Sequence, residues 1–503
     1  MSEGYESSLA LDEPPSLRHL SRQPGMPTHR STQLSLPTRR RLALGAALVL
    51  LTGCAHPEAS SPALSPETTA AALTARTLHD DGLRRFLLQN LGHEPAAWDF
   101  ETLSWVAFYY HPSLELARAQ WATARAAQTT AAARANPTLS LTPGYSTNSP
   151  AGTSPWFPAL NLDFLLETSG KRDRRAAIEK FAAEAAQLNV LSTAWQVRSE
   201  LRHALGEAVA TERRLPLLRT QADAQRQLVA LLAQRLAAGA ITALELSTPR
   251  LALIKAEAAV ADAQGQVAVA RSHLAQALSI PSDALGDLRL DAAVAPPGPA
   301  LSAAALAAAR RESLQSRADV LGALARYHAA QAALQLEAAK RYPDVHLGPG
   351  YQWDQGQNKW TLGLTVELPL FHRNEGPIAE AQARRDEAAA QLNVTQAQII
   401  AAIDNAAATQ TAASAQLEHA RRLRTELERQ SALVQARLAA GGADQTERQL
   451  AQLELLDAEL SLVDAEAAAA RAMGGLEDAL QVPFSNLAAV TTVPLSAAQS
   501  RTP

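Results

Sequence analysis

The chain has 503 residues, of which 47% are hydrophobic but only 4% are aromatic, and its formal net charge at pH 7 is −4. Large globular cores depend on aromatic bulk, whereas long helices packed at close range favour Ala and Leu, so this composition argues against a compact enzyme domain. The weakly acidic charge excludes a polyanion-binding face, and no nucleic-acid partner is expected.

The first predicted element is an export signal that ends at the single cysteine of the chain. Arg39-Arg40-Arg41 precedes an apolar run over residues 42–51, which Thr52-Gly53-Cys54 closes. A basic start, a short apolar core and small residues before the cut are typical of a secretory signal, and the run is too short for a permanent membrane helix. Residues 1–25 are predicted to be a polar extension, with Met26 as an alternative start.

The Leu-Thr-Gly-Cys ending of this signal resembles a bacterial lipobox. The resemblance implies that the thiol of Cys54 is lipidated and that Cys54 becomes the mature N-terminus. Ala55 follows the cysteine, which by the same resemblance favours sorting to the outer membrane. A chance cysteine beside a signal peptide is the alternative.

The remainder of the chain contains two copies of one unit. Pro143-Gly144-Tyr145 matches Pro349-Gly350-Tyr351, and further matches follow at a slowly decreasing offset as far as Pro281 and Pro483. Such self-similarity predicts a duplicated structural unit. The predicted divisions are 1–53, a signal peptide with an N-terminal extension; 54–110, a lipid-anchored N-terminal segment; 111–281, the first repeat; 282–316, a linker; 317–483, the second repeat; and 484–503, a C-terminal tail.

Each copy contains a predicted β-hairpin. Residues 138–146 and 156–166 in the first copy, and 344–353 and 360–370 in the second, alternate apolar and polar side chains, with a turn at 355–358. Strands of this length with one apolar face are typical of transmembrane barrels, although a soluble hairpin packed on a helix shows the same alternation. Four strands cannot close a barrel, and an open sheet in lipid leaves backbone groups unsatisfied. Strands in a membrane therefore require several chains to share one barrel.

Each hairpin is followed by a long helix, predicted over 176–238 in the first copy and 376–440 in the second, then a Gly turn and a returning helix. Helices far longer than the globular average, with narrow apolar stripes, are typical of coiled coils. Pro216 and Pro249 have no counterparts in the second copy and are expected to kink the helices of the first.

This order of elements behind a lipobox resembles the outer membrane factor family, the TolC-like efflux proteins, over residues 99–483. The most specific stretches are His111-Pro112-Ser113-Leu114 and the segment 369–379, in which Arg373-Asn374-Glu375-Gly376 looks like members that serve heavy-metal pumps of the cobalt–zinc–cadmium type. The resemblance implies a mainly α fold with a transmembrane β part. Long coiled-coil helices would form a trimeric α-barrel, and four strands per chain would contribute to a 12-stranded β-barrel.

The function that the resemblance implies is a passive outer-membrane channel of a tripartite efflux pump. A homotrimer, surrounded by outer membrane lipid and anchored at Cys54, would extend into the periplasm. There it would meet a periplasmic adaptor (membrane fusion) protein and an inner-membrane pump of RND type. Two alternatives stay open: the exit duct of a type I protein secretion system, and a structural periplasmic coiled-coil lipoprotein.

By the same resemblance, the two Gly turns are the tips that adaptor hairpins contact. The predicted tip residues are Gly239, Ala240, Ile241 and Thr242 in the first copy, and Gly441, Gly442 and Asp444 in the second. The first turn matches the pattern of the family. The second departs from it at Gly442 and Ala443, which puts an inter-chain salt bridge from this tip in doubt.

Glu245 and Glu447 match the family position that carries an acidic ring in the mouth of the channel, where six carboxylates in a trimer would favour cations. Both also fit a capping box that starts at Thr242 and Asp444 respectively. Helix capping and channel constriction therefore both stay open for these two residues.

No catalytic chemistry is predicted. The sequence has no nucleophile elbow, phosphate loop or dinucleotide motif, so no enzyme activity and no cofactor are expected. The histidines lack ligand spacing, so no metal site is predicted, and a structural or solvated role is preferred for His346, on the polar face of a strand, and for His372. The aromatic cluster Trp98–Tyr110 is predicted to serve packing rather than ligand binding.

Overall fold

The computed structural model describes residues 65–95, 97–286, 288–290 and 302–482. The chain divides into two units, residues 1–65 and 66–503, and the described fold is that of the second. Cys54 and the predicted export signal lie outside the described residues. Within them, no helix combines the length and the apolar character that crossing a bilayer requires.

Among the described residues, three helices precede the first copy: α2 (Pro66–Thr74), α3 (Asp81–Leu91) and α4 (Phe100–Tyr110). Asp80 and Asp99 begin α3 and α4, because each carboxylate accepts a hydrogen bond from a backbone N–H of the first helical turn. Every residue of α4 from Thr102 to Phe108 is buried. The aromatic cluster therefore serves packing, as predicted.

The two copies share one element order, in which a helix, a β-hairpin, a long helix and a returning helix follow each other. In the first copy these are α5 (Pro112–Ala132), β1 (Thr138–Thr142), β2 (Ala159–Leu166), α6 (Lys171–Ala237) and α7 (Ala243–Leu278). In the second they are α9 (Ala318–Ala339), β3 (Val345–Asp354), β4 (Gln357–Val366), α10 (Glu375–Ala439) and α11 (Gln445–Leu480). The short helix η1 (Ser282–Leu285) and helix α8 (Ala303–Ser316) lie in the stretch expected to link the copies.

The four strands form one antiparallel sheet in the order β1-β2-β3-β4, so the pairing of β2 with β3 joins the copies. The prediction of a four-residue turn at 355–358 was wrong, because Asp354 already pairs with Gln357. The turn consists of Gln355 and Gly356, whose φ values of 48° and 85° match the right-handed twist of a two-residue hairpin.

Three strands are shorter than predicted, and their neighbours explain why. Pro143 follows β1 and Pro158 precedes β2, and proline has no N–H to donate to a ladder. Strand β4 ends at Val366 rather than at residue 370, because Val366 pairs with Val345, the first residue of β3.

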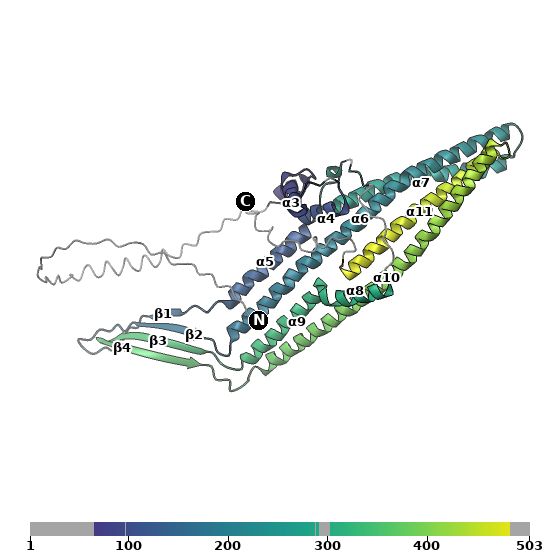
Figure 1. Cartoon of the computed structure of the whole chain (residues 1–503). Coiled ribbons are helices and arrows are strands. Elements are labelled where there is room, and N and C mark those ends of the chain that lie inside the picture. The colour runs from purple at the N-terminus through teal and green to yellow at the C-terminus, as the bar shows by residue number, and fades with distance from the viewer. Residues whose placement is uncertain (1–64, 96, 287, 291–301, 483–503) are drawn as a thin grey trace, which may run out of the picture. The chain divides into compact units, whose positions relative to one another are not determined.

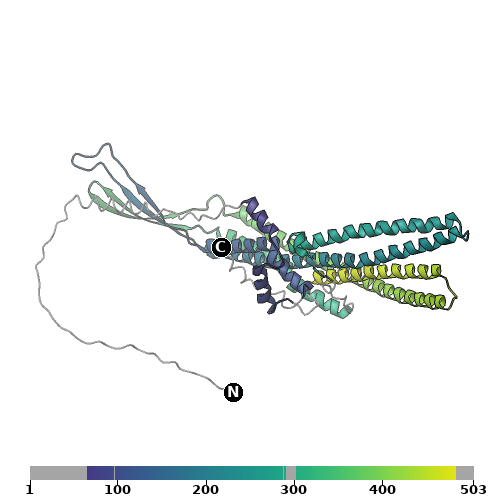
Figure 2. The ribbon, with the colours of Figure 1, turned by 90° about the horizontal axis from the view of Figure 1, so that it is seen from above.

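The long helices α6 and α10 contain 67 and 65 residues, and each packs against its returning helix. Pro216 and Pro249 do not end the helices in which they lie. The turns of both helix pairs lie at the end of the unit opposite the strands (Figures 1 and 2). Small side chains such as Ala413, Ala465 and Ala469 fill the interface between α10 and α11, as close helix packing requires.

The main hydrophobic core lies where α3, α4 and α5 cover the middle of α6 and the end of α7. Its fully buried leucines are Leu83, Leu103, Leu114, Leu201, Leu205, Leu274 and Leu278. In the second copy a smaller cluster around Ile403, Leu476 and Leu480 is covered by α8. Within the described residues, the core of the first copy thus contains aromatic rings of α4, such as Trp105 and Phe108, whereas the cluster of the second copy contains none.

Candidate functional site

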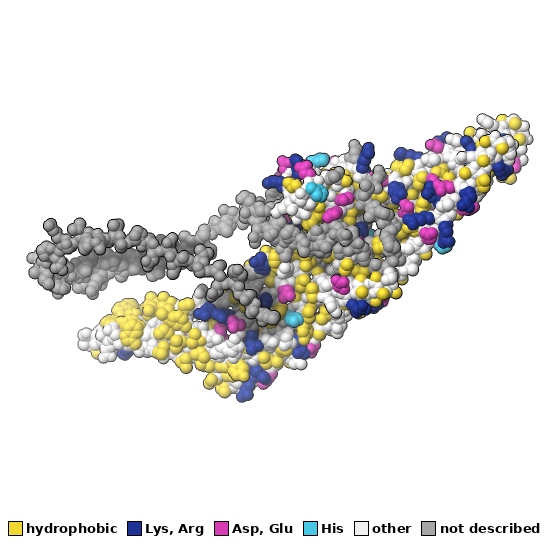
Figure 3. All heavy atoms as spheres, in the orientation of Figure 1, with side chains coloured by type: hydrophobic (Ala, Val, Ile, Leu, Met, Phe, Trp, Pro, Cys, Tyr) yellow, Lys and Arg dark blue, Asp and Glu magenta, His cyan; other side chains and the backbone are white. Residues whose placement is uncertain are grey.

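The sheet has one apolar and one polar face, because alternate residues of each strand share a face. Leucines and aromatic rings gather on the apolar face, and many of them are more than half exposed: Leu139, Leu141, Trp360, Leu362 and Leu364. Hydrophobic side chains accordingly cover the strand region in Figure 3. Strands β1 and β4 each have one edge without a partner within the described chain.

The polar face carries small and polar side chains. Its members are Thr138, Ser140, Thr142, Ala159, Asn161, Asp163, Leu165, His346, Gly348, Gly350, Gln352, Asp354, Gln357, Lys359, Thr361, Gly363 and Thr365. Leu165, the partner of His346, is the one large apolar side chain among them. His346 Nδ1 lies 2.9 Å from Asp163 Oδ2, so this predicted polar-face histidine has a carboxylate partner. The exposed His372 lies beyond the end of β4.

Both tips end their first helix in the same way. Gly239 has a φ of 73° and Gly441 a φ of 75°, the left-handed conformation that glycine adopts without steric cost. The N–H of Ala240 donates to Arg235 O at 2.9 Å, and the N–H of Gly442 donates to Arg437 O at 2.8 Å. These are Schellman turns, which satisfy the last carbonyls of α6 and α10.

The first tip begins its returning helix with a capping box. Thr242 Oγ1 accepts from the Glu245 N–H at 3.4 Å, and the Thr242 N–H donates to Glu245 Oε2 at 2.6 Å. The hydrogen bond from the backbone of Thr242 lowers the pKa of Glu245, and the Thr242 hydroxyl adds to it. Glu245 therefore caps α7, which was one of its two predicted roles.

The second tip begins with a different device. Asp444 accepts from the N–H groups of Thr446 at 2.7 Å and Glu447 at 2.9 Å, and also from Arg235 Nη2 at 2.6 Å. The Arg235 guanidinium, followed by the Glu447 N–H, lowers the pKa of Asp444 to about 2. Glu447 lies 3.6 Å from Arg437, and no reciprocal capping bond forms from its side chain. The capping box expected here is therefore wrong for Glu447.

Arg235 was not among the predicted site residues. It lies on α6 and donates to Asp444, the N-cap of α11, 209 positions later. Its counterpart in the second copy, Arg437, instead donates to Gly442 O at 2.8 Å within its own tip. Two arginines at equivalent positions thus have different partners, because the second copy has Asp444 where the first has Thr242.

Arg235 and Asp444 are the last of a series of polar contacts between α6 and α11, which we call the polar seam. The contacts are Arg198–Glu477 (2.9 Å), Ser199–Asp478 (2.6 Å), Arg202–Asp478 (2.9 Å), Arg213–Glu466 (2.9 Å), Arg214–Asp464 (2.7 Å), Gln221–Asp457, Gln227–Gln449 (3.0 Å) and Arg235–Asp444 (2.6 Å). Residue numbers rise along α6 while they fall along α11, so the two helices run antiparallel. The seam joins the copies along most of the length of α11.

The end of the seam far from the tips is buried. The side chains of Arg198 and Glu477 are 5% and 11% exposed, whereas Arg214 and Asp464 nearer the tips are 38% and 50% exposed. Burial and the neighbouring Arg202 lower the pKa of Arg198. Its guanidinium carbon lies 4.9 Å from the centroid of the Phe100 ring, so α4 stacks on the buried pair.

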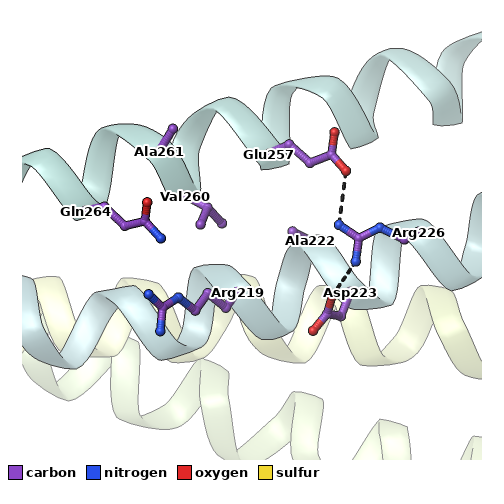
Figure 4. A pocket seen from close by; sticks show the side chains of 8 residues that line it. All are labelled: Arg219, Ala222, Asp223, Arg226, Glu257, Val260, Ala261 and Gln264. Carbon is purple, nitrogen blue, oxygen red and sulfur yellow. Dashed lines mark hydrogen bonds and ion pairs between the residues drawn. The ribbon is translucent and has the colours of Figure 1, made fainter.

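A groove of about 520 Å³ lies between α6 and α7, away from the tip (Figure 4). Arg226 donates to Asp223 at 2.5 Å and to Glu257 at 3.0 Å. Arg219 also lines the groove, so the formal charges of its lining sum to zero. Ala222, Val260 and Ala261 supply an apolar part. Within the part of the chain that the structure describes, no three His, Cys, Asp or Glu side chains come together as a metal-ligand cluster.

A family model described as "Outer membrane efflux protein" matches residues 108–279 and 309–480. The cobalt-zinc-cadmium resistance protein CzcC of Cupriavidus metallidurans is 24% identical over 231 residues, which are 45% of this chain and 53% of CzcC. The chain thus spans about half the length of this relative.

Two solved structures are similar over nearly their whole length. The outer membrane protein VceC of Vibrio cholerae superposes with a TM-score of 0.61 at 23% identity, over 76% of this chain and 96% of VceC. CusC, described for its transmembrane channel formation, superposes with a TM-score of 0.61 at 20% identity, over 78% of this chain and 95% of CusC. The fold is therefore TolC-like, with long helices and a β part, as predicted.

Proposed function

The chain belongs to the outer membrane efflux protein family, and on this premise we propose that it is the outer-membrane exit duct of a tripartite efflux pump. Solutes would reach it from an inner-membrane transporter of RND type through a periplasmic adaptor. The duct itself would be passive and carry out no catalysis. The observation that carries the proposal is a sheet with unpaired edges and an exposed apolar face, continuous with helices that end in two capped tips.

The sheet supports the membrane part of this proposal. Four strands leave two open edges, and unpaired backbone N–H and C=O groups are too costly in lipid. Pairing of β4 of one chain with β1 of the next would remove every edge, and three copies would give a 12-stranded barrel. The exposed leucines would then face the hydrocarbon, and the polar face would line the lumen.

The helices support the periplasmic part. Helix α6 has 67 residues and at 1.5 Å per residue would be about 100 Å long. We propose that the tips, Gly239 to Thr242 and Gly441 to Asp444, are the contact sites of the adaptor. In a trimer, Glu245 and Glu447 would also constrict the channel mouth. Capping does not prevent this role for Glu245, because the side chain of a capping residue can also face the lumen.

The proposed cargo is a heavy-metal cation. CzcC is a cobalt–zinc–cadmium resistance protein, and the Arg373-Asn374-Glu375-Gly376 segment resembles members that serve such pumps. We further propose that lipid attached to Cys54 anchors the N-terminal segment in the outer membrane, with the helices in the periplasm.

Two measurements test the duct. The purified mature protein should migrate as a trimer that dissociates on heating, and it should form cation-selective pores in planar lipid bilayers. A monomer that stays in solution without detergent after Cys54→Ala would overturn the proposal in favour of a structural coiled-coil lipoprotein. Deletion of the gene should sensitise cells to zinc or cadmium. If the deletion instead abolishes the secretion of a polypeptide, the protein is the exit duct of a type I secretion system.

A further inference from the structure

We propose that His346 and Asp163 form a weak, transient binding station for Zn²⁺ or a chemically similar divalent cation on the polar face of the sheet. The proposal rests on the proposed function in one respect, since only a site that lines the lumen would meet the cargo; cation binding by the pair itself does not require a pore. It adds a cargo-binding site within the strands to a duct that is otherwise proposed to be passive.

The geometry of the pair is that of a carboxylate-oriented metal ligand. His346 Nδ1 lies 2.9 Å from Asp163 Oδ2, and a carboxylate can only accept, so Nδ1 carries the hydrogen. The lone pair of the neutral imidazole is then on Nε2, which is the atom that would bind a cation. Carboxylates hold ligand histidines in this way in metalloproteins, fixing the tautomer and raising the basicity of the free nitrogen.

Strand register supports the site independently of that hydrogen bond. His346 pairs with Leu165 of β2, so Asp163 lies diagonally across the strands and on the same face. Leu165 and Thr365, the partners of His346 on the two neighbouring strands, flank it, whereas the next residues on the same face of β3 and β4, the paired Gly348 and Gly363, have no side chains. A Cβ built on Gly363 would meet nothing nearer than Gly348 O at 3.5 Å, and one built on Gly348 nothing nearer than Leu162 O at 3.6 Å, so no side chain closes off the sheet surface at these two positions.

The exposure of the two side chains and the charges around them favour reversible binding of a cation. The side chains of His346 and Asp163 are 42% and 44% exposed. At the foot of the sheet, the opposite charges of Lys171 and Asp344 are paired at 2.8 Å, and those of Arg175 and Glu167 are also paired. One imidazole ligand, oriented by one carboxylate, makes a weak site, which is what a conduit requires, because an ion must leave as readily as it enters. Imidazole selects Zn²⁺ over Mg²⁺, whose preferred ligands are oxygens.

The first test compares Zn²⁺ and Mg²⁺ on single channels of the full-length trimer in planar bilayers. Zn²⁺ should reduce the current more than Mg²⁺ at equal concentration, and His346→Gln should remove this difference. Asp163→Asn should weaken the apparent Zn²⁺ affinity by about tenfold, the usual effect of losing a carboxylate behind a histidine ligand. His372→Gln is the matched control and should behave as the wild type. An unchanged Zn²⁺ effect in His346→Gln overturns the site.

A second test does not depend on conductance. Diethyl pyrocarbonate modifies free imidazole nitrogens, and peptide mass spectrometry reports each histidine separately. Zn²⁺, but not Mg²⁺, should slow the modification of His346 and leave that of His372 unchanged. If the wild type shows no pores but His346 is protected, the duct is wrong and the site stands. If pores form and Zn²⁺ gives no protection, the site is wrong and the duct stands.

Discussion

At the first tip the returning helix begins with Thr242, whose hydroxyl and backbone exchange hydrogen bonds with Glu245 three residues on. At the second tip it begins with Asp444, which caps the helix and also holds Arg235 of the other copy at 2.6 Å. The backbone of the two turns is the same, with a left-handed glycine and a Schellman turn in each. One tip is therefore self-contained, whereas the other is tied to its neighbour. Two copies of one fold can thus keep the same turn geometry, while one different N-cap residue, Asp444 in place of Thr242, adds an ion pair that links the second tip to α6 of the first copy.

The largest expected effect is at the buried end of the polar seam. Glu477 pairs with Arg202 at 3.0 Å as well as with Arg198 at 2.9 Å, so Glu477→Ala would leave both arginines without this shared carboxylate. Removing one partner of a buried ion pair costs about 3–5 kcal/mol. The equivalent residue of the first copy is already Ala275, which is buried without any ion pair. Urea denaturation of the detergent-solubilised protein should show the loss. Asp464→Ala, in the exposed part of the seam, is the control and should cost less than about 1 kcal/mol.

The turn glycines test what the tips share. Gly239→Ala and Gly441→Ala should each destabilise their tip by about 1–2 kcal/mol, because a side chain is strained at positive φ. Gly442→Ala should be tolerated, since its Cβ would meet only Arg437 O at an ordinary 3.7 Å. Hydrogen exchange of the tip amides should report both substitutions equally. Clearly unequal losses would mean that the two turns do not share one backbone geometry in solution.

The ion pair between Arg235 and Asp444 tests what the two tips do not share. Asp444→Asn keeps the cap but removes the charge, and an exposed ion pair of this kind is worth about 0.2–1 kcal/mol. Amide exchange at the second tip should therefore rise by about fivefold at most, and added salt should reduce the difference from wild type. Arg235→Gln should reproduce the effect. The matched control is Arg214→Gln, because Arg437 itself donates to Gly442 O within the second tip, whereas Arg214 forms an exposed ion pair of the polar seam away from the tips. An effect of Arg214→Gln on second-tip exchange as large as that of Arg235→Gln would contradict the role of this ion pair.

Acid should loosen the second tip over a defined range. The pKa of Asp444 is lowered from 3.8 to about 2, so its stabilising contribution is present above pH 4 and is lost as the pH falls from about 4 to about 2. Hydrogen exchange at the second tip, corrected for intrinsic rates, should increase over this range in the wild type. In Asp444→Asn the same increase should be absent, and its persistence would assign the transition to another group.

The smallest effect on stability is expected from replacing Glu245 and Glu447. These substitutions test the role of the two residues in ion conduction separately from their role in folding. Glu245→Gln retains a side-chain oxygen for the capping box, and Glu447→Gln loses only an exposed 3.6 Å contact with Arg437. The double variant should remain folded but lose cation selectivity in planar bilayers. Unchanged selectivity would leave capping as the role of Glu245 and remove the acidic constriction.

Much of the local structure followed from the sequence. Alternation predicted both hairpins, and the pattern of apolar residues predicted the long helices to within a few residues of α6 and α10. The Gly turns and the Thr242–Glu245 capping box were also predicted, because hydrogen bonds between residues three to five positions apart depend on local residue types. Strand ends were less accurate, since a strand stops where its partner stops.

The ties between the copies needed the tertiary structure. Arg235 and Asp444 are 209 positions apart, and Arg198 and Glu477 are 279 apart. The sequence spacing of neither pair predicts a contact, because these partners are determined by the register in which α6 and α11 pack. The same holds for His346 and Asp163, which share a face by alternation but meet only because β2 pairs with β3. The sequence by itself determined each hairpin and each tip through local hydrogen bonding, and the packing of one copy on the other decided which charges face each other.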